Sequence, residues 1–285
     1  MSDSQLPDDR VIVERLRQEL AKTEPSRRRR IIEKFVLAAL GSIPWIGGFL
    51  SAAYDYKAEE GTLKQDSLQT QWLEEHQGKI AALRETLAEI EKRFDALGTT
   101  IEDRIQSQEY LGLVRKAFRA WDEADTHEKR RYIANLVTNA AGTRVCSDDV
   151  VRLFIDWLEL YHEAHFAVIR EIFQYPGSTR YDIWSAIYGD IPREDSAEAD
   201  LYKLLIRDLS TGGVIRQERD TNSMGQFVRK RPQKTGARRV APTTMESAFE
   251  GTKPYVLTEM GKQFVHYTMN EVVTRIESGS NGPES

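Results

Sequence analysis

The sequence predicts a mainly α-helical protein with a small β-component near its C-terminus. Apolar residues recur every three or four positions over most of the chain, which is the spacing of one face of an α-helix. The alternation typical of a β-strand occurs only in two short pieces, "VIRQE" after Gly213 and "KPYVL" from residue 253. With 285 residues, of which 30% are charged and 40% hydrophobic, the chain is long enough for two globular domains.

Residues 1–26 predict a short amphipathic helix that ends at Pro25 and precedes a helical domain over 27–162. This stretch lacks the apolar core of a signal peptide, and the single cysteine, Cys146, excludes an intramolecular disulfide. We therefore expect a cytoplasmic protein. The net charge of −5 argues against coating of nucleic acid over the whole surface, but it leaves room for a local basic patch.

An uncharged run of 19 residues, 35–53, follows the four arginines at 27–30. As one helix it would reach about 28 Å, close to the hydrocarbon thickness of a bilayer. Pro44 and three glycines interrupt a helix instead, so residues 27–56 are expected to form a hairpin of two helices. The apolar residues assigned to this hairpin, with the proline at its turn, are Phe35, Leu40, Pro44, Trp45, Ile46, Phe49 and Leu50.

Two interpretations of the hairpin stay open. In one, other helices or a second subunit bury it. In the other, it stays covered until a trigger releases it into a membrane, with the arginines at anionic headgroups. A single-pass anchor is disfavoured, because the upstream arginines would place the rest of the chain on the outer side.

Residues 59–106 predict a coiled-coil helix. Apolar residues alternate at spacings of three and four over three heptads, with charged residues between them. A seam this narrow needs a partner helix, either in the same chain or in a second copy, which would make the protein a homo-oligomer. The seam consists of Ile80, Leu83, Leu87, Ile90, Phe94, Leu97 and Ile101.

Helical patterns continue to residue 162. Leu111, Val114, Phe118 and Trp121 form one stripe. Acidic residues are expected to start two later helices, Asp125 in "DTHE" and Asp195 in "DSAE".

From residue 163 to 276 the expected elements are helix, short helix, helix, strand, long polar connection, strand and helix. "LSTGGVIRQE" at the end of the third helix and "YVLTEMGKQFV" at the start of the last one resemble winged-helix regulators. The resemblance implies a winged-helix domain with a small β-wing, followed by a disordered tail over 277–285.

The long connection holds six cations and no acid between residues 227 and 239, "FVRKRPQKTGARR". A wing of this charge suits contacts with phosphates. Acidic residues on the third helix argue the other way, so both nucleic acid and a protein remain candidate partners. The residues assigned to nucleic-acid binding are Arg229, Lys230, Arg231, Lys234, Arg238 and Arg239 in the connection and Lys203 and Arg207 on the third helix.

The segment "AWDEADTHEKRRYIANLVTNAAG" resembles the middle region of bacterial abortive-infection proteins of the Abi-alpha type. The matching residues are Glu128, Ala134, Asn135, Leu136 and Ala140. This resemblance implies a role in defence against phage.

No phosphate-binding loop, dinucleotide fingerprint, nucleophile elbow or zinc-protease motif occurs in the sequence. His162 and His165 have a spacing that can hold a metal, but no companion ligand pair accompanies them, and capping or surface roles are expected. The sequence therefore predicts a non-enzymatic binding or regulatory protein without a cofactor or bound metal. The alternative is an abortive-infection effector that inserts the hairpin 35–53 into a membrane.

Overall fold

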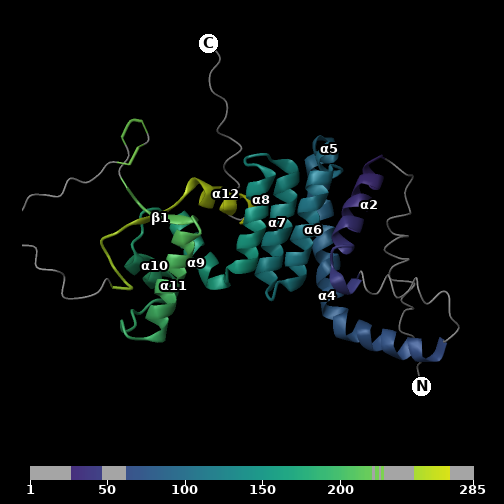
Figure 1. Ribbon diagram of the computed structural model, residues 1–285, viewed down its shortest axis with the longest axis horizontal. Coiled ribbons are helices and arrows are strands. Elements are labelled where there is room, and N and C mark those ends of the chain that lie inside the picture. The colour runs from purple at the N-terminus through teal and green to yellow at the C-terminus, as the bar shows by residue number, and fades with distance from the viewer. Residues whose placement is uncertain (1–26, 47–61, 220–221, 225, 228–246, 270–285) are drawn as a thin grey trace, which may run out of the picture. The chain divides into compact units, whose positions relative to one another are not determined.

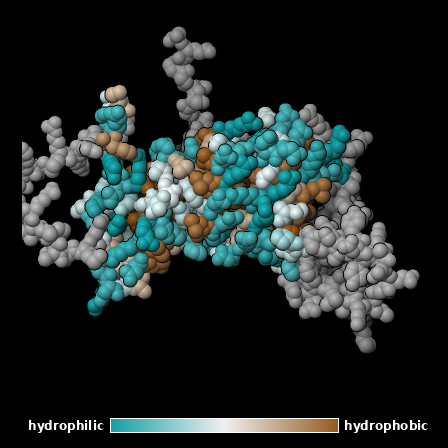
Figure 2. Space-filling view, viewed as in Figure 1, coloured by the Kyte–Doolittle hydropathy of each residue, from teal (hydrophilic) through white to brown (hydrophobic). Residues whose placement is uncertain are grey.

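The computed structural model describes residues 27–46, 62–219, 222–224, 226–227 and 247–269 (Figure 1). It is mainly helical, with one two-stranded antiparallel sheet among these residues. The chain divides into two compact units, Met1–Glu159 and Leu160–Ser285. The boundary predicted from the sequence lies after residue 162. On the face seen in Figure 2, hydrophilic residues cover most of the described surface and apolar ones form small separate areas.

The first unit is a stack of helices around an aromatic core. Helix α4 packs on α7, α6 packs on α7, and α2 packs on α6. The Phe35 ring meets those of Phe94 and Phe118 edge-on at 5.2 and 6.1 Å. The predicted stripe on α6 is buried, as expected. The helices are α2 (Arg27–Leu40), α4 (Thr62–Leu97), η2 (Gly98–Ile101, a 3₁₀ turn), α5 (Glu102–Ile105), α6 (Gln108–Glu123), α7 (His127–Gly142) and α8 (Asp148–Leu160).

The heptad seam lies on α4, but the helix does not continue to residue 106. It ends at Leu97 because Gly98 takes a positive φ of 71°, which favours glycine. Four seam residues are buried, Leu83, Ile90, Phe94 and Ile101. Ile80 and Leu87 are half-buried, and Leu97 is 38% exposed.

Helices of the same chain supply the partners of this seam. Helix α4 packs along α7, and Thr86 of α4 accepts a hydrogen bond from the Trp121 indole at 3.2 Å. Arg93 donates to the Asn135 amide oxygen of α7 at 2.5 Å. Of the two partners considered for the seam, the structure therefore shows the one within the chain.

The break in the apolar run lies where the sequence predicted it. Helix α2 ends at Leu40, and a new helical turn begins at Pro44, the position that tolerates proline best. Phe35 and Ile43 are buried, Leu40, Trp45 and Ile46 are half-buried, and Pro44 is exposed. The second arm, with Phe49 and Leu50, lies outside the described residues. Among the helices that the structure describes, none is both long and apolar enough to cross a membrane.

The second unit follows the predicted order of elements. Strands β1 and β2 pair antiparallel, with Ile215 opposite Leu257 and Gln217 opposite Tyr255. An isolated bridge joins Thr179 to Pro254 beside them. The elements are α9 (Glu163–Gln174), α10 (Arg180–Tyr188), α11 (Ala197–Thr211), β1 (Ile215–Gln217), β2 (Tyr255–Leu257) and α12 (Glu259–Thr268).

Two close approaches fix the turn between α11 and β1. A Cβ on Gly212 would lie 2.1 Å from the Tyr161 hydroxyl oxygen, and one on Gly261 would lie 2.2 Å from the carbonyl oxygen of Val214. Thr258 caps α12 and also donates to the Gly213 carbonyl at 2.6 Å. These positions explain why "TGG" and "TEMG" occur side by side at one end of the small sheet, before β1 and after β2.

Both predicted acidic helix starts were one residue away from the observed caps. Thr126 caps α7 and Ser196 caps α11, each accepting a backbone N–H with its hydroxyl. Asp195 instead binds Arg193 in a two-pronged ion pair at 2.8 Å. A hydroxyl next to the aspartate therefore takes the capping role in both helices.

Candidate nucleic-acid interface

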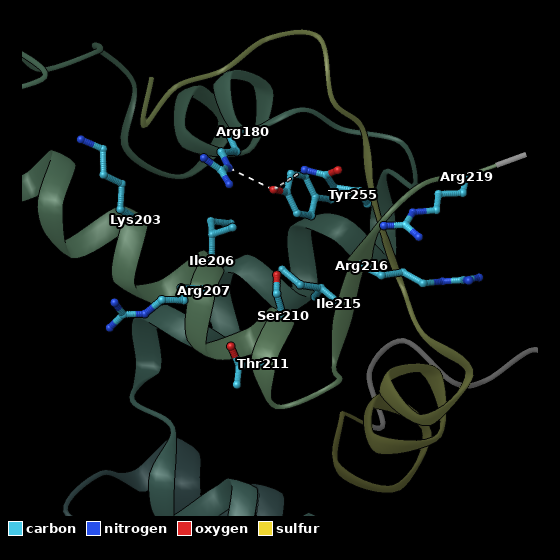
Figure 3. A pocket seen from close by; sticks show the side chains of 11 residues that line it. Arg180, Lys203, Ile206, Arg207, Ser210, Thr211, Ile215, Arg216, Arg219 and Tyr255 are labelled. Carbon is cyan, nitrogen blue, oxygen red and sulfur yellow. Dashed lines mark hydrogen bonds between the residues drawn. The ribbon is translucent and has the colours of Figure 1, made fainter. Parts of the chain in front are cut away.

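A shallow groove of about 400 Å³ runs across the second unit (Figure 3). Side chains of α10, α11, β1 and β2 form its walls. Five of the lining residues are cations and none is a carboxylate, so the charged groups that line the groove are all positive. The cations are Arg180, Lys203, Arg207, Arg216 and Arg219, and the other lining residues are Ile206, Ser210, Thr211, Ile215, Gln217 and Tyr255.

Arg180 and Tyr255 lie at the centre of the groove. The Arg180 Nε donates to the Tyr255 hydroxyl at 3.1 Å, and the guanidinium carbon lies 5.6 Å from the centre of that ring. The buried Tyr202 donates its hydroxyl to the Arg180 carbonyl at 2.8 Å. Burial raises the pKa of Tyr202, which keeps this donor neutral and the helix start in place. In the view of Figure 3, the pair lies between the two cations of α11 and the two arginines of the strand side.

Lys203 and Arg207, the two cations predicted on the third helix, both line the groove. Each has a carboxylate close by: the Lys203 Nζ is 3.5 Å from Glu194, and the Arg207 Nε is 3.7 Å from Asp208. Arg207 is the more accessible, with 71% of its side chain exposed against 39% for Lys203. An incoming anion therefore competes with a protein carboxylate at both positions.

Arg216 and Arg219 form a different arrangement around Phe227. Their guanidinium carbons lie 4.9 and 5.8 Å from the centre of the Phe227 ring, and 48% of the Phe227 surface is exposed. The Arg216 Nε is buried and has no hydrogen-bond partner among the described residues. Within the described residues neither arginine forms an ion pair. We call these three residues the stacking cluster.

The six predicted cations at 229–239 lie outside the described residues, but the flanking residues on both sides contact the groove. Before the gap, Phe227 contacts Arg216. After it, the Ser247 carbonyl accepts a hydrogen bond from Arg180 at 3.4 Å. The two described residues that flank the gap, Phe227 and Ser247, therefore both contact arginines that line the groove.

Glu194 holds the returning chain in place. Its carboxylate accepts hydrogen bonds from the Ser247 hydroxyl and, at 2.9 Å, from the Ala248 N–H. Slight burial tends to raise the pKa of Glu194, but these hydrogen bonds and the Lys203 charge outweigh it and lower the pKa. Phe249 then packs its ring 5.2 Å from that of Trp184.

The two cations of α11, Lys203 and Arg207, both follow its first turn. The first turn carries Glu198 and Asp200, both exposed. Leu201 and Leu204 follow, with 52% and 39% of their surface exposed. The acidic end weighs against a helix that contacts phosphates along its whole length.

The histidine pair acts as a helix cap. The His165 Nδ1 accepts the His162 N–H at 3.1 Å, and the His165 ring stacks on Tyr161 at 5.0 Å. Among the described residues, no cluster of three or more histidine, cysteine or acidic side chains could hold a metal ion.

The residues that carry the Abi-alpha resemblance lie in α7. Four are buried in the core of the first unit, Ala134, Asn135, Leu136 and Ala140. Glu128 accepts a hydrogen bond from Tyr132 at 2.5 Å. Their contacts are structural, and they form no surface site.

No protein-family model matches the chain, and no curated protein or solved structure matches it either. Its function is therefore inferred from the groove itself. The sequence pointed to Lys203 and Arg207 but missed Arg180, Arg216, Arg219 and Phe227. Of these four, only Arg216 and Arg219 had a local signal, the two arginines in "VIRQER". The site as a whole could not be read from the sequence, because β-pairing brings its residues together.

Proposed function

We propose that the chain is a non-enzymatic binding protein that holds nucleic acid by its backbone phosphates in the groove of its second unit. The observation that carries the proposal is a groove lined by five cations and no carboxylate. Phosphate contacts supply most of the affinity of nucleic-acid-binding proteins, and arginine suits phosphate because its planar fork donates two parallel hydrogen bonds.

The arrangement of the unit supports a winged helix as the binding domain. Three helices precede an antiparallel pair of strands and a last helix, and the bridge at Thr179 adds a third β contact. In this assignment α11 is the recognition helix and the chain between β1 and β2 is the wing. The groove is lined by α11, by both strands and by Arg219, which follows β1.

The resemblance of α7 to abortive-infection proteins favours a regulatory role in phage defence. The helical first unit would then link binding to a response. Self-association through the heptad seam is not favoured, because Leu83, Ile90 and Phe94 are buried within the chain. Membrane insertion of 35–53 would require Phe35 and Ile43 to leave that same core.

Fluorescence anisotropy with labelled oligonucleotides, measured over a series of salt concentrations, tests the proposal. The variant is Arg216→Gln with Arg219→Gln. The matched control is Arg84→Gln with Lys92→Gln, which removes the same charge from exposed positions of α4. We expect the wild type to bind. In the groove variant, the log–log salt slope should fall by about 0.7 to 0.9 for each phosphate that is no longer neutralised.

The control should keep both the affinity and the slope of the wild type. If the wild type binds no DNA or RNA at low salt, the proposal is wrong. If the control loses as much affinity as the groove variant, overall charge rather than the groove is responsible, and the proposal fails as well.

A further inference from the structure

The stacking cluster offers flat surfaces at the edge of a cationic groove. The guanidinium carbons of Arg216 and Arg219 lie 4.9 and 5.8 Å from the centre of the Phe227 ring, and about half of the surface of Phe227 is exposed. Aromatic rings and guanidinium planes are the two protein surfaces on which unpaired bases stack. Phosphate binding alone would explain the two charges, but it would not explain an exposed aromatic ring beside them.

The setting of the cluster adds a second observation. The buried Arg216 Nε has no hydrogen-bond partner among the described residues, and within them neither arginine is neutralised by a carboxylate. Among the described residues, no carboxylate competes with a ligand for these two charges. Lys203 and Arg207, in contrast, each lie within 4 Å of an acid.

The start of α11 disfavours a duplex. If α11 entered a major groove with its first turns, Glu198 and Asp200 would approach the phosphates of the duplex, and like charges repel. Leu201 and Leu204 would face polar base edges there. A single strand avoids both problems, because it can contact Lys203, Arg207 and the strand side of the groove without lying along the first turn of α11.

We propose that the groove selects single-stranded nucleic acid over duplex and that Phe227, which lies beside Arg216 and Arg219, stacks an unpaired base. This inference rests on the proposed function and adds the class of nucleic acid to it. A duplex keeps its bases stacked on one another, so it gains nothing from Phe227. Its affinity would depend only on the cations.

The experiment compares three labelled probes: a short oligothymidylate, the same backbone with abasic sites in place of the bases, and a duplex of equal length. Each is titrated with the wild type and with Phe227→Leu, which keeps an apolar side chain but removes the ring. The control variant is Tyr175→Leu, an aromatic of the same unit that is 62% exposed and does not line the groove. Circular dichroism melting checks that each variant is folded.

We expect the wild type to bind the oligothymidylate at least about tenfold more tightly than the duplex. Phe227→Leu should weaken that binding by about tenfold, the usual effect of losing one stacked base, and leave the salt slope unchanged. The same substitution should not change the affinity for the abasic strand. Tyr175→Leu should bind all three probes like the wild type.

Equal or tighter binding of the duplex by the wild type overturns the inference but leaves the proposed function intact. An equal loss on the abasic strand has the same result, because the ring would then act on the backbone. Failure of the wild type to bind any of the three probes overturns the proposed function, and the inference falls with it.

Discussion

The Trp45 indole donates a hydrogen bond of 2.6 Å to the Asp122 carboxylate, which also binds the Lys79 ammonium at 2.8 Å. The Trp45 ring lies 5.0 Å from the ring of His76. The residue after the hairpin break is thus tied to both α4 and α6. This tie links the most membrane-like stretch of the sequence to the folded helical unit.

Trp45→Asp is expected to destabilise the first unit by at least about 2 kcal/mol. The change removes a half-buried aromatic side chain and places a second carboxylate next to Asp122. Urea denaturation followed by circular dichroism measures it. Leu37→Asp is the control in the same uncharged run: Leu37 is 68% exposed, so its loss should stay within about 0.5 kcal/mol. Equal losses at the two positions would contradict the packing described for the hairpin.

The seam residues on α4 should differ widely in their contribution to stability. Ile90 is fully buried, so Ile90→Ala is expected to cost about 2–5 kcal/mol of the free energy of unfolding. Leu97 is 38% exposed at the end of the helix, and Leu97→Ala should cost about 1 kcal/mol or less. A uniform coiled-coil seam would instead give similar losses at both sites, which the same denaturation experiment would reveal.

Gly212→Ala should destabilise the second unit, because its Cβ would lie 2.1 Å from the Tyr161 hydroxyl oxygen and 3.1 Å from the Asp208 carbonyl oxygen. Overpacking of this kind costs about 1–3 kcal/mol. Adding Tyr161→Phe removes the clashing oxygen, so the double variant is expected to recover part of the loss in a double-mutant cycle. Gly261→Ala meets the Val214 carbonyl oxygen at 2.2 Å, and Tyr161→Phe should not rescue it. Rescue of both glycine variants alike would show that the contact is not specific.

The capping box of α10 should make the second unit less stable in acid. Thr179 donates its hydroxyl and its N–H to Asp182 at 2.7 and 2.9 Å, and these hydrogen bonds lower the Asp182 pKa. The stabilisation is present above the ordinary aspartate pKa, about 3.9, and is lost as the pH falls through the lower folded value. Thermal melts between about pH 5 and 2 should therefore fall less steeply for Asp182→Asn than for the wild type. Identical slopes would show that the carboxylate contributes nothing to stability.

Thr179→Val tests the other half of the box. It removes the hydroxyl that accepts the Asp182 N–H at 3.3 Å, and such a loss typically costs about 1 kcal/mol. The loss should persist at neutral pH, where Asp182→Asn leaves the hydroxyl cap in place.

The order of elements could be read from the sequence because periodicity, glycines and caps are local signals. "GSIP" predicted the break after α2, and "TGG" predicted the end of α11. The end of α4 was missed, although Gly98 stands in the pattern, because the apolar spacing continues across it to Ile101. The heptad spacing predicts which side chains share an apolar face, but it does not predict where the helix ends.

The groove could be predicted only in part, since it depends on contacts between distant segments. Lys203 and Arg207 share a helix, and their charges pointed to a site. Arg180 and Arg216 come together only when β1 pairs with β2, and Phe227 reaches the cluster only after the chain leaves the sheet. No spacing rule links residues that are this far apart in sequence.

An anion that binds Lys203 must displace the Glu194 carboxylate. In the free protein this carboxylate already occupies the Lys203 ammonium, while its other contacts hold the chain at Ser247 and Ala248. A phosphate that reaches Lys203 replaces an internal counterion, so little attraction is gained at that position. Small anions gain least, since they cannot reach the arginines of the strand side at the same time. If the groove binds nucleic acid as proposed, a long polyanion contacts both sides together, and we expect the groove to favour polymers over free phosphate.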